Sequence, residues 1–505
     1  MQEPETTSPS DAKSWQLSLV FCTLVVIGFL YAFEPITHWF VIPVWFCGVL
    51  MGRDAMDWFR GRLSLFNPAG VIGLLGVHFF FLAPLLHVAW NSWMPYVERP
   101  ADWRDWLGIM ALFNAVGLLA YGWARRAVME TTRQKTAPKV WELNEHRLVW
   151  ALLAGLAVSA ALQCWVYASL GGIGGYIQAV TESIGADNTE SAMAGMGWIF
   201  MVSETFPILA MILYAVWARR RPAAGKWAVI VAVLAGYFVL KMLFGGLRGS
   251  RSNTVWGLFW AVGIVHLWVR PISRKFVLVG VCFLVAFMYF YGFYKGLGHR
   301  VLDEWQGSSL SEMSKKSGRS FDGVLLGDLG RADVQAFLVH RLWRTGSDYR
   351  YAWGRTYAAS AALLVPGRFW PDKPPLKVKD GTDAIYGAGT FAQGQWHSSH
   401  VYGIAGEAIL NFGPFAVPVA YLLFGLSVGW LQRFLTRLSP ADARLLLYPF
   451  LVNTCFSILV SDSDNLIFNF IKDGIVPLSI IWYGARIVAV PAPTLAWPAP
   501  AAQHA

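Results

Sequence analysis

Hydrophobic residues occur along this chain in long blocks, and polar residues gather in the segments between them. Most blocks are about 17–25 residues long, the length that a helix needs to cross the hydrocarbon core of a bilayer. The pattern therefore predicts an all-α polytopic membrane protein with about twelve transmembrane helices. We place these helices at residues 15–33, 38–52, 66–90, 106–123, 148–170, 197–218, 227–244, 253–269, 276–294, 404–430, 445–460 and 474–490.

The first block, Trp15–Phe33, is too long for the core of a signal peptide and lacks a cleavage site of small residues. We therefore expect it to remain as the first span. The segment after Pro491 is rich in alanine and proline, a composition that does not pack into a core, so we expect it to be disordered.

A long segment, residues 295–403, separates the ninth block from the tenth. Structureless loops above about 15 residues are uncommon unless they are functional, so we expect the functional part of the protein here. Within it, Arg331–Trp343 has apolar residues at helical spacing and predicts a short amphipathic helix. Tyr351–Val365 predicts a second short helix, which lies on the membrane surface rather than crossing it.

Lysine and arginine residues gather in alternate short loops, and the positive-inside rule places those loops and both termini in the cytoplasm. The short loop 245–252 is an exception, because it carries Arg248 and Arg251 on the outer side. The predicted organisation is a cytoplasmic N-terminal segment (1–13), a membrane domain of about nine helices (14–294), a large outer loop (295–403), a membrane domain of about three helices (404–490) and a cytoplasmic tail (491–505).

Composition supports the membrane class, because 56% of the residues are hydrophobic and only 14% are charged. A soluble protein has about 25% charged residues, so a soluble enzyme and a disordered chain are both excluded. The net charge of +10 lies in short loops, where it orients spans, and we expect no nucleic-acid partner. The five cysteines lie inside apolar blocks without metal-ligand spacing, so we expect neither a disulfide framework nor a metal, and no motif indicates a cofactor.

The first candidate site is the stretch GGLRGSRSNTVWGL, Gly245–Leu258. Its two arginines, Arg248 and Arg251, precede the eighth predicted span, and the N-terminus of a helix presents free N–H groups to an anion. Two guanidinium groups beside such an end favour a phosphate or a diphosphate. The alternative is that both arginines only anchor the helix at the headgroups.

The second candidate site is LLVPGRFWPDKPP, Leu363–Pro375, in which four prolines stiffen the backbone around Arg368 and Lys373. Phe369 and Trp370 are suited to stacking on a sugar ring, although an interfacial aromatic belt would have the same composition. Further arginines, among them Arg331, Arg341 and Arg355, make the long outer loop rich in positive charge.

The third candidate site is the return to the membrane, Gln395–Gly413, which contains His397, His400 and Glu407. An acidic residue inside a span is costly and is by default a functional hypothesis, here that of a general base. The alternatives are that Glu407 pairs with an arginine and that the histidines are ordinary surface residues.

Other acidic and basic residues carry less weight in the sequence. We expect Asp462, Asp464 and Asp473 to form a solvated acidic loop rather than a cation site. Inside predicted spans, Glu204 is expected to pair across helices and Lys241 to reach the interface.

The stretches GGLRGSRS, VPGRFWPDKP and GEAILNFGPF, together with the layout of spans around one large loop, resemble the Wzy-type O-antigen and exopolysaccharide polymerases of bacteria. The resemblance covers residues 245–425 at the level of motifs. It implies a membrane glycosyltransferase of GT-C-like architecture in the inner (cytoplasmic) membrane, with residues 295–403 in the periplasm. It also implies an undecaprenyl-diphosphate-linked oligosaccharide as donor, no required metal, and a chain-length regulator and a flippase as partners.

The resemblance also implies roles for the candidate residues. Arg248 and Arg368, supported by Arg251 and Arg355, would bind the donor diphosphate together with Lys373. Arg331 or Arg341 would hold the growing glycan, and Glu407 or His400 would accept the proton of the attacking hydroxyl group.

Three other functions stay open at this point. O-antigen ligases share the general layout, and a structural partner of an export complex would need none of these residues. A transporter or flippase for a lipid-linked or anionic glycan would need charged residues at mid-depth in the membrane, whereas the sequence predicts that charge collects at one face.

Overall fold

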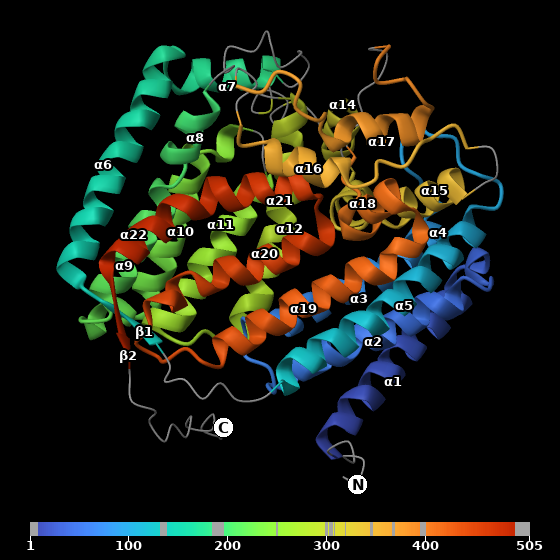
Figure 1. Ribbon diagram of the computed structural model, residues 1–505, viewed down its shortest axis with the longest axis horizontal. Helices are drawn as coiled ribbons and strands as arrows, with labels where there is room; N and C mark the ends of the chain where they lie inside the picture. The colour runs from blue at the N-terminus through green and yellow to red at the C-terminus, as the bar shows by residue number, and fades with distance from the viewer. Residues whose placement is uncertain are drawn as a thin grey trace.

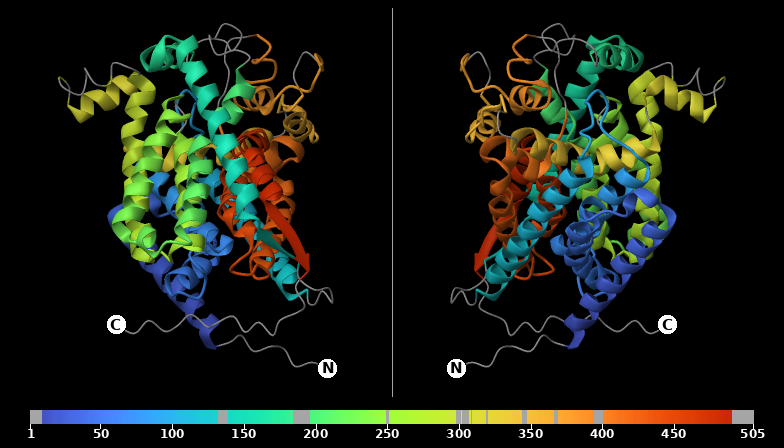
Figure 2. Two further views of the ribbon diagram at one scale, coloured as in Figure 1. Left: turned by 90° about the vertical axis from the view of Figure 1, so that its left-hand side faces the viewer. Right: turned by 90° about the vertical axis from the view of Figure 1, so that its right-hand side faces the viewer.

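The protein is a bundle of helices in the computed structural model, which describes residues 9–131, 139–183, 196–248, 251–297, 301, 307, 309–318, 320–343, 347–365, 369–393 and 400–489. Figures 1 and 2 show the short helices between residues 310 and 412 gathered at one end of the bundle, which we call the loop end. The first residues of helix α1 (Pro9–Ala32) and the small sheet of strands β1 (Lys139–Leu143) and β2 (Ala485–Ala489) lie at the opposite end (Figure 1).

The helices and strands follow one another along the chain as α1 (Pro9–Ala32), α2 (Val41–Phe59), α3 (Pro68–Val77), α4 (Ala83–Ala89), α5 (Trp103–Glu130), β1 (Lys139–Leu143), α6 (Glu145–Ser169), α7 (Gly172–Ser183), α8 (Gly197–Ser203), α9 (Phe206–Ala218), α10 (Trp227–Leu243), α11 (Arg251–Ile264), α12 (Arg274–Leu297), α14 (Leu310–Ser317), α15 (Ala332–Trp343), α16 (Arg355–Ala362), α17 (Lys377–Tyr386), α18 (Gly403–Phe412), α19 (Val417–Leu435), α20 (Tyr448–Val460), α21 (Ser463–Asn469), α22 (Ile475–Gly484) and β2 (Ala485–Ala489). Short helical turns of other types lie between or extend these helices, and those used below are η4 (Gly246–Arg248), η7 (Gly323–Asp328) and η10 (Phe470–Gly474).

Nine helical segments of the described chain are long and apolar enough to cross a membrane. They are Ala12–Ala32, Pro68–Ala89, Trp103–Glu130, Glu145–Ser169, Gly197–Ala218, Arg251–Val269, Arg274–Lys295, Pro414–Leu435 and Ser463–Gly484. Two further apolar helices, α10 and α20, are shorter. The all-α membrane class is thus confirmed, while the count of about twelve spans and the GT-C-like architecture stay predictions.

Several predicted boundaries are wrong. The tenth block was expected to be one helix over 404–430, but Gly413 adopts a φ of +85° and Pro414 follows, so the chain breaks there into α18 and α19. The last span begins at Ser463 rather than at residue 474, and the chain turns into strand β2 after Gly484. Helix α1 already begins at Pro9, inside the predicted N-terminal segment, and the tail 491–505 lies outside the described residues.

The long segment 295–403 contains the short helices α14–α17, as its patterning predicted in part. Helix α15 matches the predicted amphipathic helix, but nearly every residue of it is buried, because it packs against α5, α17 and α18. Helix α16 covers only Arg355–Ala362 of the second predicted helix. Helices α15, α16 and α17 thus lie over the end of the bundle (Figure 1), whereas α14 projects to one side (Figure 2).

Helices α5 and α19 lie side by side and approach so closely that their contact requires glycine. A Cβ atom on Gly425 would lie 2.4 Å from the carbonyl oxygen of Tyr121, and one on Gly429 would lie 2.9 Å from that of Arg125. Lipid chains are as apolar as leucine, so close packing of small residues is what holds membrane helices together. The guanidinium of Arg125 also forms two hydrogen bonds with the buried Asp54 carboxylate, which adds α2 to this core.

Substitution of Gly425 by alanine tests this packing. Because the added methyl group meets the backbone of α5, we expect Gly425→Ala to lower the free energy of unfolding by about 1–3 kcal/mol, which thermal unfolding in detergent micelles measures. The matched control is Gly122→Ala on α5, where a Cβ atom has nothing within 4 Å. An equal loss of stability in both variants would contradict the close approach.

Candidate functional site

Helix α18 places Glu407 at the centre of the loop end. The helix begins at Gly403, whose φ is +69°, and a Cβ atom there would lie 2.8 Å from the carbonyl oxygen of Leu459 on α20. Glycine therefore lets α18 start directly against α20. Glu407 follows one turn later and is only 2% exposed.

The carboxylate of Glu407 accepts three hydrogen bonds from two other helices. The hydroxyl group of Thr356 on α16 donates to Oε1 at 2.8 Å, and the backbone N–H of Ser463 on α21 donates to Oε2 at 2.7 Å. The hydroxyl group of Ser463 donates to Oε1 at 2.5 Å. Burial raises the pKa of Glu407, while the bonds from Ser463 and Thr356 oppose that rise. The described hydrogen bonds thus make Glu407 a junction of α16, α18 and α21, rather than the partner of an arginine.

A buried ion pair lies beside this junction. The ammonium group of Lys377 on α17 contacts the carboxylate of Asp462, and it also donates to the carbonyl oxygen of His400 at 2.9 Å. Asp462 is fully buried and accepts from the backbone N–H groups of Tyr402 and Gly403, each at 2.9 Å. The expectation of a solvated acidic loop is therefore wrong for Asp462.

Lys377, Thr356 and Ser463 were not among the predicted site residues, and Asp462 was predicted only as part of a solvated loop. The available signal was the position of Asp462 two residues after the apolar run that ends at Val460, because an acidic residue at the end of a buried helix requires a partner. No three His, Cys, Asp or Glu side chains of the described residues are grouped as metal ligands would be.

His400 lies at the edge of the same cluster. Burial lowers the pKa of His400, Asp333 opposes that effect, and the nearby charges of Arg331 and Lys377 add to it. The imidazole is therefore neutral at pH 7 and able to accept a proton. The guanidinium of Arg331, at the start of α15, donates to the carbonyl oxygens of Gly327 and Gly330.

Four of the arginines expected to bind an anionic substrate form ion pairs with carboxylates of the chain. Arg355 pairs with Asp380, and Arg341 pairs with Asp348 at 2.8 Å. Arg251 pairs with Asp328, and Arg248 pairs with Glu204. Lys373 donates to the carbonyl oxygen of Val365 at 3.3 Å. Arg368 and His397 lie outside the described residues.

Arg251 and Arg248 lie apart from the Glu407 junction. Arg251, the first residue of α11, forms two hydrogen bonds with the Asp328 carboxylate in η7, at 2.6 and 2.9 Å. Arg248, in η4, lies 2.9 Å from the Glu204 carboxylate.

Glu204 is the centre of a second polar cluster, buried inside the bundle. Besides Arg248, its carboxylate contacts the ammonium group of Lys472 at 2.7 Å and accepts from the side-chain amide of Asn253 at 2.9 Å. The prediction that Glu204 pairs across helices is confirmed. Lys241 is buried and lies 3.8 Å from Asp473, so the prediction that it reaches the interface is wrong.

One helical segment connects the two clusters. Ser463, which binds Glu407, opens α21, and Lys472, which binds Glu204, lies in η10 directly after it. At 1.5 Å per residue the two positions are about 14 Å apart along the helix. The structure thus brings Glu407, His400, Arg331 and Arg355 to one cluster, and Arg248 to the other.

Comparison of the chain with protein-family models, with curated proteins and with solved structures gave no match.

Replacing Glu407 by glutamine tests the junction. At the Oε2 position the amide NH₂ group would face the backbone N–H of Ser463, and at the Oε1 position the hydroxyl groups of Thr356 and Ser463 would have to turn from donors into acceptors, so we expect Glu407→Gln to cost about 1–3 kcal/mol in the free energy of unfolding. Thermal unfolding measures this loss, and the exposed Glu98 provides the matched control Glu98→Gln. Unchanged stability of the Glu407 variant would show that the three bonds do not form.

Replacing Lys377 by methionine tests the buried ion pair. The variant leaves the Asp462 carboxylate buried without its counter-charge, and we expect a loss of about 3–5 kcal/mol in the free energy of unfolding. Lys379→Met, on the same helix, is the control and should be nearly neutral. The double variant Lys377→Met/Asp462→Asn should recover part of the loss, and a purely additive result would contradict the pairing.

Proposed function

We propose that the chain is a membrane glycosyltransferase that polymerises lipid-linked oligosaccharide repeat units into O-antigen or exopolysaccharide. In this proposal it lies in the bacterial inner membrane with the loop end in the periplasm and both termini in the cytoplasm. The observation that carries the proposal is the grouping of His400, Lys377 and Arg331: the ammonium group of Lys377 donates to the carbonyl oxygen of His400 at 2.9 Å, and burial together with the charges of Arg331 and Lys377 lowers the pKa of the His400 imidazole.

The proposed reaction transfers a glycan from undecaprenyl diphosphate. The terminal hydroxyl oxygen of the acceptor attacks the anomeric carbon of the donor glycan, and the bond from that carbon to the diphosphate oxygen breaks. The diphosphate leaves with the electron pair, and a ring nitrogen of His400 takes the proton of the hydroxyl group. Glu407 acts as a positioning residue, because its carboxylate is already engaged by Thr356 and Ser463.

Positive charge at the loop end would stabilise the departing diphosphate. Arg355 is the candidate best placed for this role, because its side chain is 43% exposed and its helix also carries Thr356 of the Glu407 junction. To bind the diphosphate, the guanidinium of Arg355 would either leave the Asp380 carboxylate or contact the carboxylate and the diphosphate at the same time. Loss of one such donor costs about 2–4 kcal/mol in the activation barrier of comparable reactions.

A second candidate function is the transport of a lipid-linked or anionic glycan. The Glu204 cluster favours it, because Glu204 and Lys472 are charged and lie inside candidate spans. The prediction that charge collects at one face of the membrane is wrong for these residues. Intramembrane charges of this kind mark substrate pathways in transporters, although they also join helices.

The length of the polysaccharide on a gel tests the proposal in a deletion strain complemented with wild type, His400→Gln, Arg355→Gln or the control Lys315→Gln, with equal expression. We expect single capped repeats in the deletion strain, a full ladder with wild type and control, and no ladder with His400→Gln. We expect shortened chains with Arg355→Gln. Repeat units that accumulate on the cytoplasmic leaflet would instead indicate a flippase, and full-length chains left on the lipid carrier would indicate a ligase.

The pH profile of purified enzyme tests the role of His400. Because the pKa of His400 is lowered from its ordinary value of 6.5, the neutral base persists to a more acidic pH and transfer falls only below pH 6.5. An acidic limb above pH 6.5 would contradict this assignment.

A further inference from the structure

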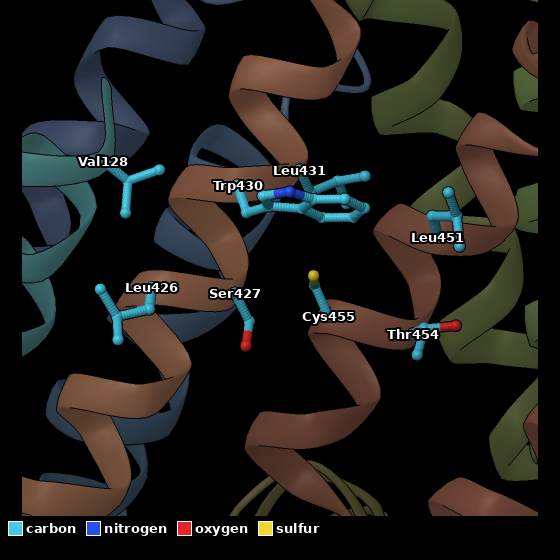
Figure 3. A pocket seen from close by; sticks show the side chains of 8 residues that line it. All are labelled: Val128, Leu426, Ser427, Trp430, Leu431, Leu451, Thr454 and Cys455. Carbon is cyan, nitrogen blue, oxygen red and sulfur yellow. The ribbon is translucent and has the colours of Figure 1, made fainter. Parts of the chain in front are cut away.

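An open groove lies on the side of the bundle, away from both polar clusters. Its volume is about 520 Å³, within the range of ligand-binding pockets. Figure 3 shows α19 in the middle of the groove with α5 on one side and α20 on the other. The groove, which we call the α19 groove, is lined by Val128, Leu426, Ser427, Trp430, Leu431, Leu451, Thr454 and Cys455.

The lining of the α19 groove suits a hydrocarbon chain. Its two hydroxyl groups are bonded within their own helices, Ser427 to the carbonyl oxygen of Leu423 and Thr454 to that of Phe450, each at 3.0 Å. The remaining lining residues are apolar except for the weakly polar thiol of Cys455 and the single indole N–H group of Trp430. The groove lies on the candidate spans Trp103–Glu130 and Pro414–Leu435, so it faces the bilayer.

A basic rim follows the groove at the end of α19 that lies opposite the loop end. Trp430 is 63% exposed, and Arg433 follows it three residues later on the same side of α19, while Arg437 lies in the turn just beyond the last residue of the helix, Leu435. Arg433 donates to the carbonyl oxygen of Val128 at 3.4 Å, and no carboxylate is among its contacts in the described part of the chain.

Two further contacts continue this rim toward α20. The ring of Phe434 stacks on Trp430 with centroids 5.8 Å apart, and the guanidinium of Arg444 lies 5.4 Å from the same Phe434 ring. Arg444 pairs with Asp442, and Glu130 ends α5. The rim thus places the guanidinium of Arg433, which is bonded to a backbone carbonyl oxygen, directly beside the apolar groove.

We propose that the α19 groove binds one acyl chain of an anionic phospholipid whose phosphate lies against Arg433. A phospholipid places its phosphate at the membrane surface and its chain below. Arg433 and Leu426 have the same arrangement, about 10 Å apart along α19. Basic pockets at the cytoplasmic ends of membrane helices select anionic headgroups in this way. The site lies outside the proposed catalytic centre and does not rest on the proposed function.

Native mass spectrometry of the full chain in detergent micelles tests the proposal, with phosphatidylglycerol and phosphatidylcholine of identical chains as probes. We expect wild type to retain phosphatidylglycerol in preference. Because a basic residue near a membrane surface contributes about 1 kcal/mol of attraction to anionic lipid, retention should fall about fivefold for Arg433→Gln. Arg147→Gln, an exposed arginine at the start of α6, is the matched control and should retain the lipid as wild type does.

A second measurement locates the chain without relying on the arginine variants. Phosphatidylglycerol with brominated chains should quench tryptophan fluorescence more in wild type than in Trp430→Phe. Equal retention of the two lipids, an equal loss in Arg147→Gln, or equal quenching in wild type and Trp430→Phe would each overturn the proposal. A wild-type dimer in phosphatidylcholine that Trp430→Phe dissociates would also overturn it, because a second copy would then cover the groove.

Discussion

The carboxylate of Glu407 is the contact on which the arrangement of the loop end depends. It accepts from Thr356 and Ser463, so α16 and α21 are both fixed to α18. Asp462, one residue before Ser463, binds the start of α18 and Lys377 of α17 in the same way. Through the adjacent residues Asp462 and Ser463, the helices α16, α17, α18 and α21 are thus bonded to one another. Burying these two carboxylates is costly, and the charge-assisted bonds that each accepts offset that cost.

Local patterning predicted most of the helices in the bundle. An apolar block of membrane length has one stable solution in lipid, because every backbone N–H and C=O group must be bonded internally. Helix α15 followed from its apolar spacing for the same local reason. The errors lie where two local signals conflict, as at Gly413, which interrupts a block that is apolar throughout.

The candidate site was predicted in residue type but not in pairing. Arg251 finds its carboxylate 77 residues further on, at Asp328, and Arg355 finds Asp380 in a helix that the sequence did not separate from its loop. The sequence pattern of an arginine in a loop is the same whether its guanidinium binds an anionic substrate or forms an ion pair with a carboxylate of the chain. Only the fold distinguishes the two, and here it assigns Arg248, Arg251, Arg341 and Arg355 carboxylate partners.

The segment from Ser463 to Lys472 has a mechanical consequence. It is a continuous helical rod with one carboxylate attached near each end, Glu407 at Ser463 and Glu204 at Lys472. A rotation or axial shift of this rod strains both contacts at once, since a helix transmits displacement along its length. The π-helical turn η10, which is wider than an α-helical turn, contains Lys472. A change in the winding of this turn would move Lys472 relative to Glu204 and would leave the contact of Ser463 with Glu407 least affected. The loop end and the interior of the bundle are therefore joined by one continuous stretch of helical backbone.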